Sequence, residues 1–96
     1  MALHMVVLTH SPESCGWRSE ECGATFGRAF GSFRQTASSH GATVQGAWVN
    51  TAAHRHYVLI DAPNAHAVNS LLSDAGLLAI ITCEVTAVED FSSALT

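Results

Sequence analysis

The alternation of strand-like and helix-like apolar spacing is the sequence feature that most constrains the fold of this 96-residue chain. Residues 3–9 form a continuous apolar and β-branched run, which is typical of a central strand buried on both faces. From Ser19 to Ser39 the apolar residues recur at helical spacing, and His40-Gly41 is a suitable helix stop. The chain therefore begins with a predicted strand and a predicted long helix.

The predicted helix contains three glycines, Gly23, Gly27 and Gly31, spaced four residues apart beside its apolar stripe. Each costs about 1 kcal/mol relative to Ala in a helix interior. The close approach of another backbone would offset that cost, whereas a helix held by packing elsewhere would simply tolerate it. We expect close packing along the glycine face. The apolar stripe consists of Cys22, Phe26, Ala29, Phe30, Phe33 and Ala37.

The second half of the chain predicts a hairpin, a short helix and a last strand. Residues 42–52 and 54–62 have strand-like patterns separated by a short turn, which favours a hairpin. A short helix follows, from Asn64 as its N-cap to about Ala75. Residues 77–88 are rich in Ile and Val, as in a strand.

The element order βαββαβ predicts a single α+β domain, residues 1–96, with a ferredoxin-like fold. Its antiparallel sheet has the order 4-1-3-2, with two helices on one face and the first and third strands as parallel neighbours. The other sheet face stays bare. The chain is 48% apolar and only 12% charged, against roughly 25% in an average domain, so we expect a homodimer that buries this face.

The charge balance argues against several partners. The formal net charge is −4 and all four basic residues are Arg, so the clustered cations that bind nucleic-acid phosphates are missing. No apolar run approaches the ~18 residues of a membrane-spanning helix. Residues 1–8 lack the features of a secretory leader, and three cysteines without a CxxC pair fit reduced thiols, so we expect a cytoplasmic protein.

Six histidines are the candidate chemical groups, because a neutral imidazole can bind a metal or move a proton. The predicted topology divides them between the two ends of the sheet. At one end we expect His4, His54 and His56, with Asn50, Glu89 and Asp90 nearby; at the other we expect His10, Cys15, Cys22 and His66, with His40 near the same edge. His10 would then reach His54 only across a dimer.

Two local patterns suggest metal or acid–base chemistry. His54 and His56, two apart in a strand, point to one face and with a carboxylate would suit zinc or iron; the alternative is ordinary packing or surface polarity. His10 and Cys15 bracket a turn and could bind zinc or copper, or Cys15 could be a nucleophile with His10 as its base. The alternative for His10 and Cys15 is a turn that ends a strand, with Cys15 buried and inert. We expect the other cysteine, Cys83, to lie in the core.

The outer face of the predicted hairpin suggests a ligand site. Trp48, Asn50, Tyr57 and Arg55 could wall an apolar cavity that has a few polar anchors. Ordinary sheet packing explains the aromatic residues equally well, because Trp and Tyr favour strands.

The element order, the length and the bare sheet face resemble the dimeric α+β barrel superfamily, which includes antibiotic-biosynthesis-type monooxygenases, muconolactone isomerases and many uncharacterised small bacterial proteins. The segment Thr9–Cys15, and His54-x-x-Tyr57 followed by Leu59–Ala62, also resemble an uncharacterised subgroup. A proline usually follows the cysteine in that subgroup, whereas Gly16 stands here. Within the superfamily as a whole, cofactor-independent monooxygenases surround an aromatic substrate with residue types found here at Trp48, Asn50, His54 and Tyr57.

Three functions follow as expectations. The first is a homodimer that binds a small ligand through Trp48, Asn50 and Tyr57, or a transition metal through His10, Cys15, His54 and His56. The second is a cofactor-free monooxygenase or isomerase with His10 or His54 as its base, which requires an apolar cavity that reaches an imidazole. The third is a non-catalytic interaction module whose histidines are exposed or singly hydrogen-bonded.

Overall fold

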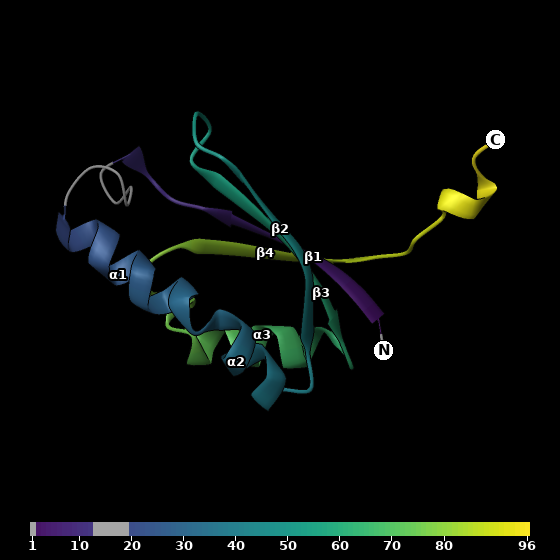
Figure 1. The fold of residues 1–96 in the computed structure, drawn as a ribbon, viewed down its shortest axis with the longest axis horizontal. Coiled ribbons are helices and arrows are strands. Elements are labelled where there is room, and N and C mark those ends of the chain that lie inside the picture. The colour runs from purple at the N-terminus through teal and green to yellow at the C-terminus, as the bar shows by residue number, and fades with distance from the viewer. Residues whose placement is uncertain (1, 13–19) are drawn as a thin grey trace.

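A computed structural model of the chain describes residues 2–12 and 20–96. Within these residues four strands form one antiparallel sheet in the order β2-β3-β1-β4, and the helices cover one of its faces (Figure 1). The strands are β1 (Ala2–Thr9), β2 (Thr43–Asn50), β3 (Arg55–Ala62) and β4 (Thr82–Val88). The helices are α1 (Glu20–Gly31), α2 (Phe33–Ser39) and α3 (Ala65–Asp74), with short 3₁₀ turns η2 (Leu77–Ala79) and η3 (Ser92–Ala94). The predicted α+β, ferredoxin-like βαββαβ fold is confirmed.

The direction of β3 relative to β1 differs from the prediction. The two strands are antiparallel neighbours, with Leu8 opposite His56 and Thr9 opposite Arg55. The connectivity explains this, because the helical crossover returns β2 in the direction of β1 and the hairpin then reverses the chain into β3. The end of β1 therefore lies beside the start of β3.

The predicted long helix is divided in two at Ser32. This residue leaves helical geometry, with φ −113° and ψ 15°, and its carbonyl accepts the backbone N–H of Thr36 at 2.9 Å. Gly31 and Ser32 are both weak helix formers, so the break costs little. It lets α2 turn Phe33 and Ala37 into the core.

The expected close packing at the helix glycines is not found where the structure tests it. A Cβ added at Gly27 or at Gly31 would have no atom within 4 Å outside the local helix. In the folded chain both positions face open space, and packing of Ala29 and Phe33 elsewhere on α1 and α2 holds these helices. The predicted cap Ser19 lies outside the described residues, as does the side chain of Cys22.

The second half of the chain follows the prediction except near residue 77. The side chain of Asn64 accepts the N–H of Ala67 at 2.8 Å and caps α3, and Gly76 ends this region with φ +79°. The predicted last strand begins late, at Thr82, because the preceding residues form the turn η2, in which the N–H groups of Ile80 and Ile81 donate to the Leu77 carbonyl at 3.1 and 3.0 Å.

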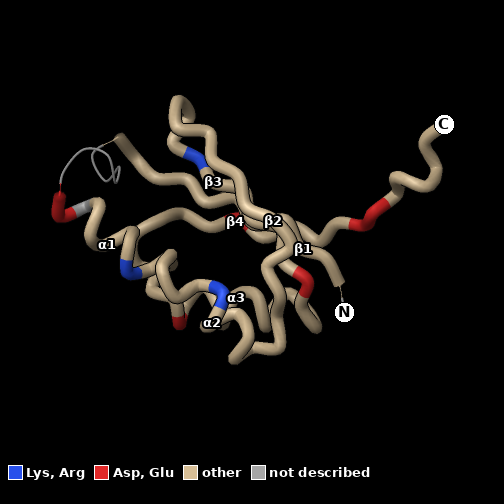
Figure 2. Tube along the Cα trace, in the orientation of Figure 1, with Lys and Arg blue, Asp and Glu red and all other residues tan. Residues whose placement is uncertain are grey.

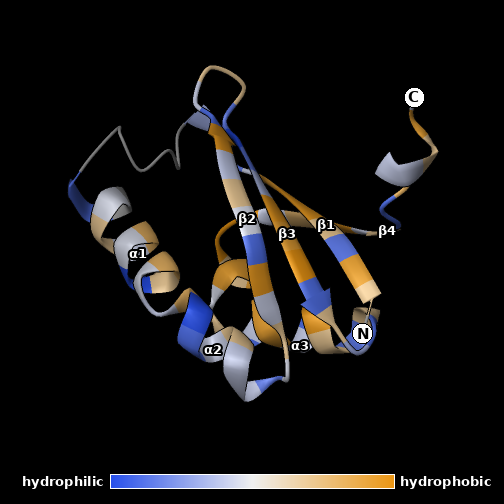
Figure 3. Cartoon of the chain, turned by 45° about the vertical axis from the view of Figure 1, so that its right-hand side comes forward, coloured by the Kyte–Doolittle hydropathy of each residue, from blue (hydrophilic) through white to orange (hydrophobic). Residues whose placement is uncertain are grey.

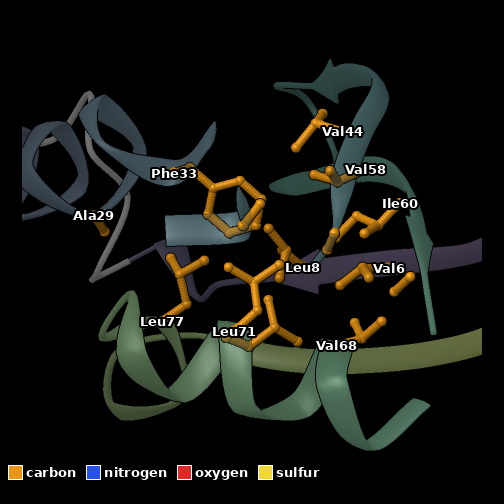
Figure 4. Close-up of a cluster of buried hydrophobic side chains, with 14 of the residues drawn as sticks. Val6, Leu8, Ala29, Phe33, Val44, Val58, Ile60, Val68, Leu71 and Leu77 are labelled. Carbon is orange, nitrogen blue, oxygen red and sulfur yellow. The ribbon is translucent and has the colours of Figure 1, made fainter. Parts of the chain in front are cut away.

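The core lies between the sheet and the helices. Leu8 and Val6 of β1 and Ile60 of β3 meet Leu71 and Val68 of α3 there, as Figure 4 shows. Apolar residues run along the central strands in Figure 3. Burial in β1 alternates, so this central strand is fully buried only on its helix side, whereas we predicted burial on both faces. No element in residues 2–12 and 20–96 covers the opposite side.

The bare sheet face and the C-terminal tail expose apolar side chains. Met5 and Leu59 are register partners in the middle of the bare face, and Trp48 on β2 is 57% exposed. The tail leaves the sheet after β4 and projects from the body, with Phe91 67% and Leu95 65% exposed (Figures 1 and 2). No helix in the described part of the chain is long and apolar enough to cross a membrane.

Candidate functional site

The antiparallel register brings three of the six histidines together, and we call His10, His54 and His56 the histidine cluster. His10 follows β1, His54 precedes β3 and His56 is the second residue of β3. The backbone N–H of His10 donates to the carbonyl of His54 at 3.1 Å, and His10 Nε2 lies 3.3 Å from His54 Nδ1. The ring centroids of His10 and His56 are 5.7 Å apart. The cluster forms within one chain, so the expectation that His10 needs a second subunit to meet His54 is wrong.

Helix α1 supplies an aromatic wall for the histidine cluster. The ring of Phe26 lies 5.4 Å from that of His10, and the ring of Phe30 lies 5.3 Å from that of His56. Phe26 and Phe30 stack on each other at 5.9 Å, as residues one helical turn apart can. The cluster is therefore enclosed on one side by apolar rings.

Burial keeps two of the imidazoles neutral at physiological pH. His10 is only 9% exposed, and burial is the main cause that lowers its pKa below the ordinary 6.5, with repulsion from His56 and then His54 adding to it. Burial also lowers the pKa of His56. The Nδ1 atoms of His10 and His56 are buried and have no hydrogen-bond partner among the described residues. Burial therefore favours the neutral form of both imidazoles, and a neutral imidazole can accept a proton.

His54 is held in an unusual backbone conformation. Among the described non-glycine residues it is the one with a positive φ, 55°. The left-handed region costs an L-residue roughly 1–2 kcal/mol. Its N–H donates to the Thr51 carbonyl at 3.2 Å and its own carbonyl accepts from His10, so the hairpin turn and the end of β1 jointly fix this conformation.

A groove of about 330 Å³ lies between the α1–α2 region and the β2–β3 hairpin, and its lining includes His56. Register places Val49 opposite His56 and Ala47 opposite Val58, so these residues share the helix-facing side of the sheet. The groove is mostly apolar and open along one side. Its lining residues are Phe30, Phe33, Arg34, Ala47, Trp48, Val49, His56 and Val58.

Most of the predicted ligand residues lie on the other side of the hairpin. Trp48 is opposite Tyr57, and Asn50 is opposite Arg55, on the bare sheet face. The Trp48 indole covers Gly46, where an added Cβ would be 2.5 Å from the ring. Asn50 Oδ1 accepts the N–H of Ala53 at 3.1 Å and so stabilises the turn. Of these four residues only Trp48 also borders the groove.

The remaining histidines do not join the cluster. His4 is opposite Ile60 and Ala87 and is buried at the other end of the sheet, so its predicted grouping with His54 and His56 is wrong. His66 is the second residue of α3, beyond the end of β3 and away from His10. His40 Nε2 lies 2.6 Å from Asp74 Oδ2, an ion pair when the imidazole is protonated.

The two carboxylates that we predicted beside His54 and His56, those of Glu89 and Asp90, lie at the other end of the sheet. Glu89 and Asp90 follow β4, whose last residue, Val88, is opposite Leu3 at the His4 end of the sheet. Predicted neighbour Asn50 does lie near His54, at the start of the same hairpin turn.

The metal prediction stays a prediction. Cys15, one of its four expected ligands, lies outside the described residues. In residues 2–12 and 20–96 no three His, Cys, Asp or Glu side chains are arranged to hold a metal ion. Cys83 packs partly buried against the core, as expected, and burial raises the pKa of its thiol, which disfavours the reactive thiolate.

Sequence reasoning missed most of the groove lining. Phe30, Phe33 and Arg34 were placed on a helix but not against β2, and Val49 was given no role. The helical stripe and the strand alternation together could have indicated that these residues face each other.

A comparison with protein-family models and with curated proteins finds no match to this chain.

Proposed function

We propose that this chain binds a small apolar or aromatic molecule in the groove, with the histidine cluster as its polar end. The observation that carries the proposal is an apolar groove of about 330 Å³ that reaches the neutral imidazole of His56. Small-molecule sites typically occupy about 300–1,000 Å³ and combine apolar walls with a few oriented polar groups. The groove is at the lower end of this range, which suits a ligand of one or two fused rings.

The aromatic walls favour a flat ligand. Phe30 and Phe33 form the helix side of the groove, and Ala47 and Val49 form the strand side. A ring placed between them would bury its faces against apolar side chains, while its edge approaches His56. Aromatic pairs add about 0.5–1.5 kcal/mol beyond area burial.

The same proposal includes a homodimer that covers the bare sheet face. Met5 and Leu59 at its centre, and the exposed indole of Trp48 at its margin, form an apolar surface. This arrangement agrees with the resemblance to the dimeric α+β barrels, in which two sheets pack face to face. The groove lies on the opposite, helix-facing side, so dimer formation would leave it accessible.

Fluorescence of N-phenyl-1-naphthylamine, a neutral probe that brightens in apolar sites, tests the ligand proposal. The wild-type chain should bind it, and Ala47→Leu, which fills the groove, should weaken binding about tenfold. Ala52→Leu in the exposed hairpin turn adds the same atoms outside the groove and should leave the affinity unchanged. Equal loss in both variants, or no binding by the wild type, would refute the proposal.

A second candidate function is acid–base catalysis on the bound molecule, as an isomerase or a cofactor-free monooxygenase. The lowered pKa values of His10 and His56 favour it, because a catalytic base must be neutral at working pH. His56 lines the groove and is the imidazole that would touch the ligand, whereas His10 and His54 are not among the lining residues.

Deuterium exchange tests this second function. Small aromatic ketones incubated in D₂O with the protein should exchange their acidic carbon-bound hydrogen, observed by NMR. His56→Gln should abolish the exchange, and His66→Gln on α3 is the matched control. Equal exchange with wild type and His56→Gln would exclude His56 as the base.

The third expectation, a module with exposed or singly bonded histidines, has less support because His10 is buried.

A further inference from the structure

The groove lining carries a positive charge without a negative one among its described residues. Among its described residues Arg34 carries a fixed positive charge, and no Asp or Glu lines the groove. This is notable in a chain with twice as many acidic as basic residues. An apolar groove with an unbalanced cation favours an occupant that brings a negative charge.

The guanidinium of Arg34 is positioned but not neutralised. Its Nη1 donates to the backbone carbonyl of Val44 at 3.2 Å, which holds the side chain against β2. One hydrogen bond leaves several N–H donors of the guanidinium for a ligand. No carboxylate pairs with Arg34 in the described part of the chain, where the ion pair formed is that of His40 with Asp74.

Arg34 and His56 both line the groove, and the strand register places their contacts at different positions along β3. Arg34 bonds Val44, whose register partner is Ile60, four residues beyond His56 on β3. Four residues of strand span about 13 Å. A flat apolar body between them would present one end to a cation and the other to a neutral imidazole.

We propose that the ligand of the groove is an apolar monocarboxylic acid, whose carboxylate pairs with Arg34 and whose ring lies against Phe30 and Phe33 with its far edge at His56. This rests on the proposed ligand-binding function. A planar guanidinium suits this anion, because it can donate two parallel hydrogen bonds to one carboxylate. Arg34 is thus a specificity-determining residue, and the aromatic walls provide the affinity.

Displacement of bound N-phenyl-1-naphthylamine by 2-naphthoate and by 2-naphthamide tests the inference, since these competitors share one ring system and differ in charge. Wild type should bind the carboxylate about fivefold more tightly, the ratio that corresponds to ~1 kcal/mol for a partly exposed ion pair. Arg34→Met keeps the aliphatic stem and should bring the ratio near one, and Arg34→Lys should restore part of it. Arg28→Met, on α1 outside the groove, should keep the wild-type ratio. Added salt should reduce the preference.

The outcomes separate this inference from the one on which it rests. No binding of the neutral probe by the wild type overturns the groove itself. If the probe binds and the two competitors have equal affinity, the groove remains a binding site but the inference that its ligand carries a carboxylate is refuted. A carboxylate preference that survives in Arg34→Met but disappears in Arg28→Met also overturns it, because the anion would then bind elsewhere.

Discussion

The folded chain should lose stability as the pH falls below neutrality, because His10 and His56 have lowered pKa values in the folded state. In the unfolded chain each imidazole takes up its proton near its ordinary pKa of 6.5. Below that pH the unfolded state binds more protons than the folded state, so proton binding favours unfolding. The stabilising contribution is fully present above about pH 6.5 and is lost as the pH falls toward the folded-state pKa values.

The size of the effect follows from linkage. Each histidine that is neutral when folded and protonated when unfolded lowers the free energy of unfolding by at most about 1.4 kcal/mol per pH unit. The two together set an upper limit of about 2.7 kcal/mol per pH unit. Against the ~5–15 kcal/mol of a typical domain, this is large enough to measure easily.

His10→Phe is the informative substitution. The phenyl ring keeps the contact with Phe26 and removes the buried Nδ1 that has no described partner, which costs roughly 1–3 kcal/mol. It also removes the hydrogen bond with His54, worth about 1 kcal/mol, but half-buried His54 can bond water instead. We expect His10→Phe to be more stable than wild type by about 1 kcal/mol above neutral pH, with about half the acid slope.

Urea unfolding followed by far-UV circular dichroism, from about pH 8 to about pH 5, measures both quantities. His66→Gln, an exposed histidine on α3, is the control and should parallel the wild type. A wild-type stability that does not fall in acid would refute the reasoning. So would a His10→Phe curve with the full wild-type slope, because the cluster would then not be the source of the pH dependence.

Three further substitutions give independent tests. Gly27→Ala should raise the free energy of unfolding by about 1 kcal/mol in chemical denaturation, and a decrease would mean that another molecule covers this glycine. His54→Gly should be about 1 kcal/mol more stable than His54→Ala in the same assay, because only glycine adopts φ 55° without strain; equal values would contradict the strained turn. Met5→Arg, at the centre of the bare sheet face, should convert the proposed dimer to a monomer in light scattering, and an unchanged mass would place the interface elsewhere.

The fold was largely predictable because periodicity and caps determine it locally. Residues 3–9 form the predicted inner strand, although this strand is fully buried only on its helix side, and Asn64 caps the predicted short helix. The break at Ser32 was not predictable from the apolar pattern, since Ala29, Phe33 and Ala37 keep helical spacing across it. The helix is divided because Gly31 and Ser32 have low helix propensity and because the break lets α2 bury Phe33 and Ala37 in the core.

The candidate site was predicted only in part, and the two failures have different causes. His10 and His54 are both candidate residues in the sequence, and the structure brings them together, whereas the assumed parallel β1–β3 pair separates them by the length of the sheet. The groove depends instead on tertiary contact. Arg34 meets the carbonyl of Val44 beside an irregular register between Val44 and Gly46, and no spacing rule gives that position.

The sequence analysis joins His10 to His54 through a dimer, but the antiparallel register makes the histidine cluster independent of the proposed dimer interface. The histidine cluster and the groove lie on the helix side of the sheet within one chain, whereas the proposed dimer uses the other side. Met5→Arg should therefore retain the wild-type affinity for N-phenyl-1-naphthylamine even as a monomer. Loss of the probe together with the dimer would mean that the open side of the groove is closed by the partner, and the site would then belong to the dimer rather than to the chain.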